Sequence, residues 1–301
     1  MKRWIALLIP MLVVGAGCSG EVGLADGSVG VQESRVGLVN VNYEHNWTDS
    51  HGAAQLTATA QFVRYSAMGR EQVARLLALP LDPGHDLPAL DRCQTHDLSI
   101  DLAEDAAMET EEQGYVELME AGDLEVKANG HKVTLLPRHF PGLLPFISGV
   151  IYGEAQTTLL SNRGHKVGTS SKGGESVGAF AARVESPPLP VLTRLAGQGP
   201  TSNVALQRGK PLSLAWQPAA RGYKHVTYLE LRFSRGERNR VLRCRLNDDG
   251  AFQVPAVHLT QARGRVTLSL NRMHRAPFSA AGLEHAELRV SVQDTAILFA
   301  R

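Results

Sequence analysis

The feature that most constrains the fold of this chain is an alternation of apolar and polar residues, which recurs over most of the sequence after Arg35. Side chains alternate between the two faces of a β-strand, so this period of two predicts strands with one buried face. Residues 71–79 carry a helical pattern that stops at Pro80, because proline breaks a helix. The sequence therefore predicts an all-β protein with one short helix. The expected strands cover residues 39–43, 56–63, 133–136, 149–152, 176–184, 212–216, 227–233, 242–246, 266–270 and 288–292.

A proline-rich segment, Ser186-Pro187-Pro188-Leu189-Pro190, divides this pattern into two parts. Such a cluster continues neither a ladder nor a helix, so we expect a short linker here. Beyond it the alternation is cleaner, and turn residues separate the strands as in a two-sheet sandwich. In pattern this part resembles an immunoglobulin-like domain, without that family's Cys-Trp-Cys spacing. The sequence thus predicts a β-rich domain over residues 35–186 and an immunoglobulin-like β-sandwich domain over residues 187–301.

The first residues have the pattern of a secretory signal. Lys2 and Arg3 precede an apolar run over residues 4–14, which is too short to cross a bilayer as a helix. The small residues Gly15-Ala16-Gly17 follow, and then Cys18. Two kinds of processing fit this pattern, namely lipidation at the cysteine and ordinary secretion with cleavage after Ala16.

The Gly15-Ala16-Gly17-Cys18 segment resembles the lipobox of bacterial lipoproteins. The resemblance implies that residues 1–17 are a signal peptide and that Cys18 becomes the first residue, linked to diacylglycerol and N-acylated. Ser19 resembles the residue found at this position in members sorted to the outer membrane. Residues 18–34 are rich in glycine and predict a flexible tether. The expected location is the cell envelope, with a lipid anchor in the outer membrane.

Charge is distributed unevenly between the two halves. Residues 19–188 hold 12 Lys+Arg against 23 Asp+Glu, whereas residues 189–301 hold 17 against 7. The acidic excess gathers between Arg92 and Lys127, a stretch without lysine or arginine. The near-neutral total of +1 gives no reason to expect a nucleic-acid partner.

Six arginines gather within the length of one hairpin in the second half. Three interpretations stay open for this cluster: a solvated face, docking onto the chain's own acidic segment, or binding of an anionic partner such as lipid headgroups, lipopolysaccharide or an acidic protein. The members are Arg232, Arg235, Arg238, Arg240, Arg243 and Arg245.

The sequence Gly174-Glu175-Ser176-Val177-Gly178 matches G-x-S-x-G, the pattern that presents a catalytic serine in esterases and lipases. That role needs a buried strand before the serine and a helix after it. Residues 163–173 are polar and glycine-rich, which predicts a loop, and the residues after Ser176 alternate like a strand. We therefore expect Ser176 to lie in a glycine-rich turn that leads into a strand, and we do not expect it to be catalytic.

The remaining cysteines and acidic residues give weaker signals. Cys244 lies between two inward leucines and is expected in a core, whereas Cys93 lies in a polar loop of the other domain. A disulfide between them stays open, because it needs their Cα atoms within about 7 Å. No cysteine or histidine spacing indicates a metal site, and the acidic run lacks the turn chemistry of a calcium loop. We expect neither a metal nor a cofactor.

These observations favour a non-enzymatic envelope lipoprotein that acts as an interaction, scaffold or adhesion component. Its expected partners are the membrane, through the lipid anchor, and another envelope protein. The first alternative is a surface module that binds carbohydrate or an anionic polymer. The second is a serine hydrolase that uses Ser176.

Overall fold

The computed structural model describes residues 33–48, 53–77, 79, 81–97, 114–139, 147–160, 165–201, 204–220, 222–235 and 238–301. Strands account for 63% of the structure and helices for 5%, which confirms the predicted all-β class. Residues Gln32–Arg301 form one compact unit, and this unit is the subject of all that follows. Cys18 and the predicted signal peptide lie outside the described residues.

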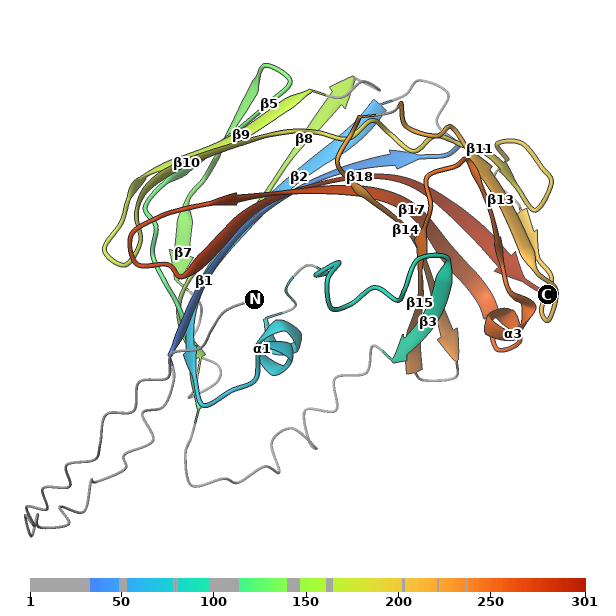
Figure 1. Cartoon of the computed structure of the whole chain (residues 1–301), viewed down its shortest axis with the longest axis horizontal. Helices are drawn as coiled ribbons and strands as arrows, with labels where there is room; N and C mark the ends of the chain where they lie inside the picture. Colours follow the sequence, from blue (N-terminus) through green and yellow to red (C-terminus); the bar gives the residue numbers. More distant parts are fainter. Residues whose placement is uncertain are drawn as a thin grey trace, which may run out of the picture. The chain divides into compact units, whose positions relative to one another are not determined.

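The main element is a ten-stranded sheet (Figure 1). Its order is β15-β14-β17-β18-β1-β2-β4-β8-β7, and β12 pairs with β18 in addition. The strands are β1 (Ser34–Asn46), β2 (Ala53–Ser66), β4 (Tyr115–Leu118), β7 (Pro137–His139), β8 (Ile147–Leu160), β12 (Val204–Leu206), β14 (Val226–Arg235), β15 (Arg238–Leu246), β17 (Arg263–Phe278) and β18 (His285–Ala300).

Two smaller sheets pack on the same face of the large one. The first has the order β10-β9-β5-β6 and the second β11-β13-β16. Their strands are β5 (Leu124–Ala128), β6 (His131–Leu135), β9 (Lys166–Gly173), β10 (Gly178–Glu185), β11 (Leu192–Leu195), β13 (Leu212–Trp216) and β16 (Ala251–Val254). A further strand, β3 (Arg92–Asp97), lies beside β15. The described helices are α1 (Arg70–Leu76) and α3 (Ala256–Leu259), and none of them is long and apolar enough to cross a membrane.

Each small sheet covers its own apolar core. The four-stranded sheet buries Val126 and Phe180 against Val41 and Phe62 of β1 and β2. The three-stranded sheet buries a separate cluster, in which Leu214 of β13 is typical, against β14, β15, β17 and β18. The alternation of the strands therefore buries two apolar cores against one face of the large sheet, and β18 contributes residues to both.

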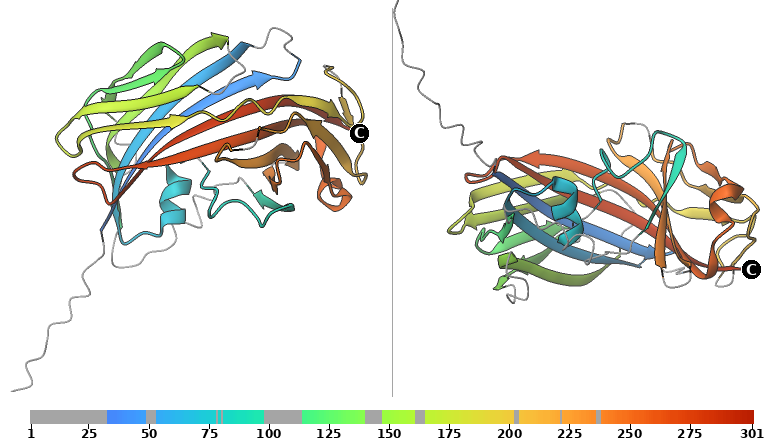
Figure 2. Two further views of the ribbon diagram at one scale, coloured as in Figure 1. Left: turned by 45° about the horizontal axis from the view of Figure 1, so that its top comes forward. Right: turned by 90° about the horizontal axis from the view of Figure 1, so that it is seen from below.

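The two halves nevertheless share one sheet, which corrects the prediction of two domains divided at residue 187. β1 of the first half pairs in parallel with β18 of the second half, from Val36↔His285 to Asn46↔Thr295. β18 and its partner β17 have 16 residues each and run through both sandwiches (Figure 2). The proline segment is thus a crossover between the two small sheets and does not break the large one.

Buried charges mark the junction between the two cores. Asp294 of β18 is fully buried and accepts hydrogen bonds from the backbone N–H of Leu192 at 2.8 Å and from His45 at 2.8 Å. Arg272 of β17 is 1% exposed and donates to the carbonyl oxygens of Pro188 and Leu189, both at 3.1 Å. Because these side chains bind the backbone of the crossover, they fix its path between the sheets.

Candidate functional site

The predicted arginine cluster lies on the hairpin of β14 and β15. The two strands pair antiparallel from Thr227↔Leu246 to Arg235↔Arg238, so the six arginines of the sequence prediction lie on one hairpin. By this register, Arg240 shares its face of the hairpin with the core residue Leu242, whereas Arg232, Arg243 and Arg245 lie on the opposite face. Their neighbours at alternate positions, such as Leu231 and Leu242, are buried in the core below. The side chains of Arg235 and Arg238, at the end of the hairpin, are outside the described part.

Glu230 neutralises two members of the cluster. It faces Arg243 across the ladder and is 7% exposed. Arg232 Nε donates to Glu230 Oε1 at 2.5 Å, and Arg243 Nε donates to Oε2 at 3.1 Å. The Arg232 side chain still keeps 66% of its surface exposed, so its remaining donors face solvent. One face of the hairpin therefore combines an internal ion pair with an accessible guanidinium.

Arg240 holds a carboxylate from the first half of the chain. Its Nε donates to Asp97 Oδ1 at 2.5 Å and its Nη2 donates to Oδ2 at 3.3 Å, while Nη1 donates to Gln261. Asp97 is the first residue of the acidic run, so one contact of the predicted kind between the two charge clusters is present. The described acidic residues farther along bind elsewhere: Glu117 pairs with Arg64, and Glu125 with two lysines.

The structure adds Arg263 and Arg265, which the sequence prediction missed. They begin β17, and Arg263 lies opposite Ser234 of β14. Both are exposed, and neither forms an ion pair with another described residue. Strand pairing, and not closeness in the sequence, brings them to the hairpin. We call the set Arg232, Arg240, Arg243, Arg245, Arg263 and Arg265 the arginine end.

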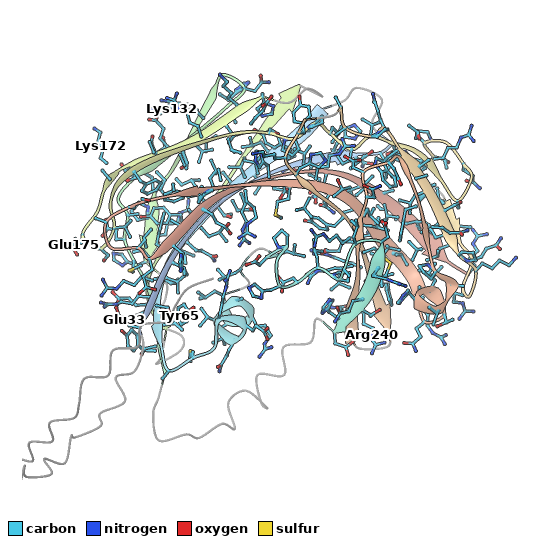
Figure 3. The ribbon with its side chains drawn as sticks, in the orientation of Figure 1. Glu33, Tyr65, Lys132, Lys172, Glu175 and Arg240 are labelled. Atoms are coloured by element: carbon cyan, nitrogen blue, oxygen red, sulfur yellow. A yellow bond between two sulfur atoms is a disulfide. The ribbon has the colours of Figure 1, made fainter. Side chains whose placement is uncertain are left out.

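The arginine end lies far from the point where the chain enters the sheet. Val36 near the start of β1 pairs with His285, the first residue of β18, whereas Gly264 pairs with Ala300, its last residue. At about 3.3 Å per residue, the 16 residues of β18 separate these positions by about 50 Å along the strand. Figure 3 shows Glu33 and Arg240 well apart in the same way.

A disulfide joins the arginine end to the first half of the chain. Cys93 of β3 is bonded to Cys244 of β15, which decides the alternative that the sequence left open. Cys244 is fully buried, as predicted, but Cys93 lies in a strand and not in a loop. The prediction placed the two cysteines in separate domains; in the structure β3 packs along β15 and brings them together.

Ser176 lies in the turn between two antiparallel strands. β9 ends at Gly173 and β10 begins at Gly178, which pairs with it. The prediction of a loop over residues 163–173 is therefore wrong for residues 166–173, where the polar and glycine residues hid a strand. The predicted strand after the serine is present as β10. A nucleophile elbow joins a strand to a helix, and this turn joins two strands.

Among the described residues, no group of three or more His, Cys, Asp or Glu side chains is placed to hold a metal ion. The chemistry that the arginine end can perform is recognition of carboxylates or phosphates by guanidinium groups. Comparison with protein-family models, with curated proteins and with solved structures found no match to this chain.

Proposed function

We propose that this protein is a non-enzymatic lipoprotein of the cell envelope, anchored through Cys18, whose arginine end binds an acidic partner protein. The observation that carries the proposal is the convergence of arginines from β14, β15 and β17 at one end of the sheet. Opposite charges attract at physiological salt within about 8 Å, which favours an anionic partner.

The contact already present at Arg240 favours a carboxylate over other anions. The guanidinium and the Asp97 carboxylate meet through two hydrogen bonds, the geometry that arginine offers to planar carboxylates. The exposed guanidinium groups of Arg232, Arg263 and Arg265 provide the same donors toward solvent. An acidic protein segment satisfies this set, and an anionic polymer is the competing partner.

The distance between the arginine end and the start of β1 supports a partner away from the anchoring membrane. The chain enters the sheet at β1, about 50 Å along β18 from Arg263. A tether that begins at Cys18 leads to β1, at the opposite end of these strands from the arginines. This placement suits a scaffold or adhesion component that holds a second protein away from the anchoring membrane.

The anchor is tested by replacing Cys18 with alanine. We expect the variant to move from the membrane fraction to the soluble fraction, because acyl chains contribute about 0.8 kcal/mol per buried methylene and none can be attached. The measurement is fractionation followed by immunoblotting, with Ser19→Ala as a matched control that keeps the cysteine. Retention of the Cys18→Ala variant in the membrane would contradict the anchor.

The binding surface is tested with an Arg263→Ala/Arg265→Ala variant and a labelled decapeptide of alternating glutamate and threonine. We expect the dissociation constant to rise about tenfold, since two exposed ion pairs contribute up to about 1 kcal/mol each and 1.4 kcal/mol is tenfold. Fluorescence anisotropy measures the binding, which should also weaken as salt is raised.

An Arg183→Ala/Arg194→Ala variant is the matched control, because it removes the same charge from exposed positions on β10 and β11. Its peptide affinity should equal that of the unchanged protein. Equal losses in both variants would show that net charge alone governs binding. Tight binding of polyphosphate or lipopolysaccharide, with no binding of the peptide, would contradict an acidic protein as the partner and support an anionic polymer.

A further inference from the structure

The large sheet has a second face, on the side away from the two small sheets. Val39 and Val41 of β1 are buried in the core under the four-stranded sheet, so Asn40 and Asn42 point to the other side. Figure 1 shows α1 on this second side, toward which the sheet curves, and β9 on the first. The chemistry of the second face is therefore set by the alternate residues of β1 and its neighbours.

Uncharged polar side chains from three adjacent strands meet on the second face. β1 lies between β2 and β18, and alternate residues of the three strands are in register there. Asn42, for example, pairs with Thr57 of β2 on one side and with Ser291 of β18 on the other. We call the following set the amide–hydroxyl face: Asn40, Asn42, Thr57, Thr59, Gln293 and Thr295.

The polar groups of the amide–hydroxyl face are accessible and almost unpaired. Each of its six side chains is partly exposed. Within the described part of the chain, Thr295 alone among them forms a side-chain hydrogen bond, a contact of 3.5 Å with Ser269. The buried side-chain polar atoms that have no partner among the described residues lie elsewhere. The amides and hydroxyls of this face are therefore available to a ligand.

Two covering segments contact the second face on either side of these amides. α1 packs through Val73 on β2 and β4. Leu87 packs on Tyr228 of β14 and on Met273 of β17. In the strand order β14-β17-β18-β1-β2, the strands β18 and β1 lie between these two contacts. The amide–hydroxyl face is thus flanked by apolar contacts and is itself polar.

The chemical character of the face selects its ligand. Asparagine is disfavoured in strands, yet two asparagines lie in the middle of β1. Amides and hydroxyls both donate and accept hydrogen bonds, so they match a ligand whose own groups do both. The neighbouring Glu44 is exposed and pairs in register with Gln293; its carboxylate accepts hydrogen bonds and disfavours an anionic ligand. A ligand rich in hydroxyl groups and without charge fits this set.

We infer that the amide–hydroxyl face binds a neutral, linear oligosaccharide. Asn46 pairs with Thr295, and at about 3.3 Å per residue the step from Asn40 to Asn46 is about 20 Å along β1. A strip of this length offers hydrogen bonds to several sugar units in a row. The inference goes beyond the proposed function and does not depend on it, because no arginine belongs to the set.

The test is isothermal titration calorimetry of the full mature chain with cellohexaose, maltohexaose, mannohexaose and chitohexaose. We expect one or more of these neutral sugars to bind with a dissociation constant on the order of 1 mM or below, because hydrogen bonds exchanged with water contribute little each. Raising the salt concentration should leave this affinity unchanged, since the ligand carries no charge.

An Asn42→Ala/Gln293→Ala variant tests the location of the site. We expect its dissociation constant for the sugar to rise about tenfold, because alanine cannot replace the hydrogen bonds of the two amides. Gln198→Ala/Gln253→Ala is the matched control, which removes two exposed amides outside this face and should bind as the unchanged protein does. Thermal unfolding checks that the variants are folded.

A second variant keeps the shape of the side chain and serves if the double variant fails to fold. Thr57→Val replaces the hydroxyl by a methyl group and should raise the dissociation constant about threefold. The Arg263→Ala/Arg265→Ala variant should keep the affinity of the unchanged protein for the sugar, because it leaves every amide of the face in place.

The outcomes separate this inference from the proposed function. Binding of a neutral hexasaccharide that weakens in the amide–hydroxyl variants and not in the control supports the inference. Equal affinity in all variants, or an equal loss in the control, overturns it. Binding of none of the sugars also overturns it and leaves the acidic partner of the arginine end standing. Salt-sensitive binding of polygalacturonate alone, lost in Arg263→Ala/Arg265→Ala, overturns it and assigns saccharide binding to the arginine end.

Discussion

Replacement of Asp248 by alanine is expected to lower the free energy of unfolding by about 3–5 kcal/mol. The carboxylate receives hydrogen bonds from Arg272 at 2.8 and 2.9 Å, from His225 at 2.7 Å and from the indole of Trp216 at 2.7 Å. Arg272 is 1% exposed, so the substitution leaves its charge buried without a counter-ion. Urea denaturation of the two proteins measures the difference.

Two further variants show whether the ion pair causes the loss. Asp249→Asn removes an exposed charge from the neighbouring position, keeps an oxygen that can accept the Ala251 N–H, and should change the stability by less than about 0.5 kcal/mol. The double variant Asp248→Ala/Arg272→Met should be more stable than Asp248→Ala alone, because no buried charge remains. The single variant Arg272→Met completes the comparison. If the double variant loses as much unfolding free energy as Asp248→Ala and Arg272→Met together, the two side chains act independently.

The pH dependence of unfolding reports on the same carboxylate. Burial raises the pKa of Asp248, but hydrogen bonds from His225, Arg272 and Trp216 outweigh it and lower the pKa well below its usual value. A depressed carboxyl pKa in the folded state stabilises the protein above the unfolded-state value of about 3.9, and this stabilisation disappears as the pH falls below it. Asparagine does not ionise, so the free energy of unfolding of Asp248→Asn should lack this contribution and should fall less between about pH 4 and pH 2 than that of the unchanged protein.

The sequence predicted the strands better than their partners. Alternation is a local property, so the apolar positions of residues 288–292 were readable without any knowledge of what they contact. The parallel pairing of β1 with β18 joins residues about 250 positions apart, and no local pattern reports it. Strands in both halves were therefore visible in the sequence, whereas the sheet that the two halves share was not.

Buried charges explain why two strands were predicted too short. The apolar alternation of β17 stops before Arg272, and that of β18 stops before Asp294, although both strands continue. Each charged side chain occupies an inward position of its strand, where an apolar residue would have continued the alternation. Both are satisfied by hydrogen bonds that exist only after the crossover is in place. A hydrophobicity pattern in the sequence does not predict such hydrogen-bond partners.

The arginine end was predictable where it depends on one hairpin and not where it depends on pairing. Residues 232–245 are close in sequence, so their cluster could be predicted from spacing alone. Arg263 joins through the register of β17 on β14. Cys93 and Asp97 join through the packing of β3 on β15, and the polar composition of residues 92–97 gave no sign of a strand.

The glycines of the G-x-S-x-G sequence have a structural explanation in the turn after β9. A Cβ atom on Gly174 would lie 2.4 Å from the backbone nitrogen of Gly122, and one on Gly122 would lie 2.3 Å from the carbonyl oxygen of Gly173. The backbone N–H groups of Ser176 and Val177 both donate to the Glu120 carbonyl oxygen, at 3.2 and 3.0 Å. The turn after β9 thus packs its backbone against the backbone of residues 120–122, and this close approach leaves no room for a Cβ atom at Gly122 or Gly174.

We therefore expect Gly174→Ala to lower the free energy of unfolding by about 2–3 kcal/mol, since the atoms in the way belong to the main chain and cannot rotate aside. Ser176→Ala is the matched control in the same turn; its side chain is exposed, and the change should stay below about 0.5 kcal/mol. Thermal unfolding of both variants measures the difference. This order of effects means that the glycines are required by packing and the serine is not. The reverse order, or loss of a fluorophosphonate label in Ser176→Ala, would restore the serine as a functional residue.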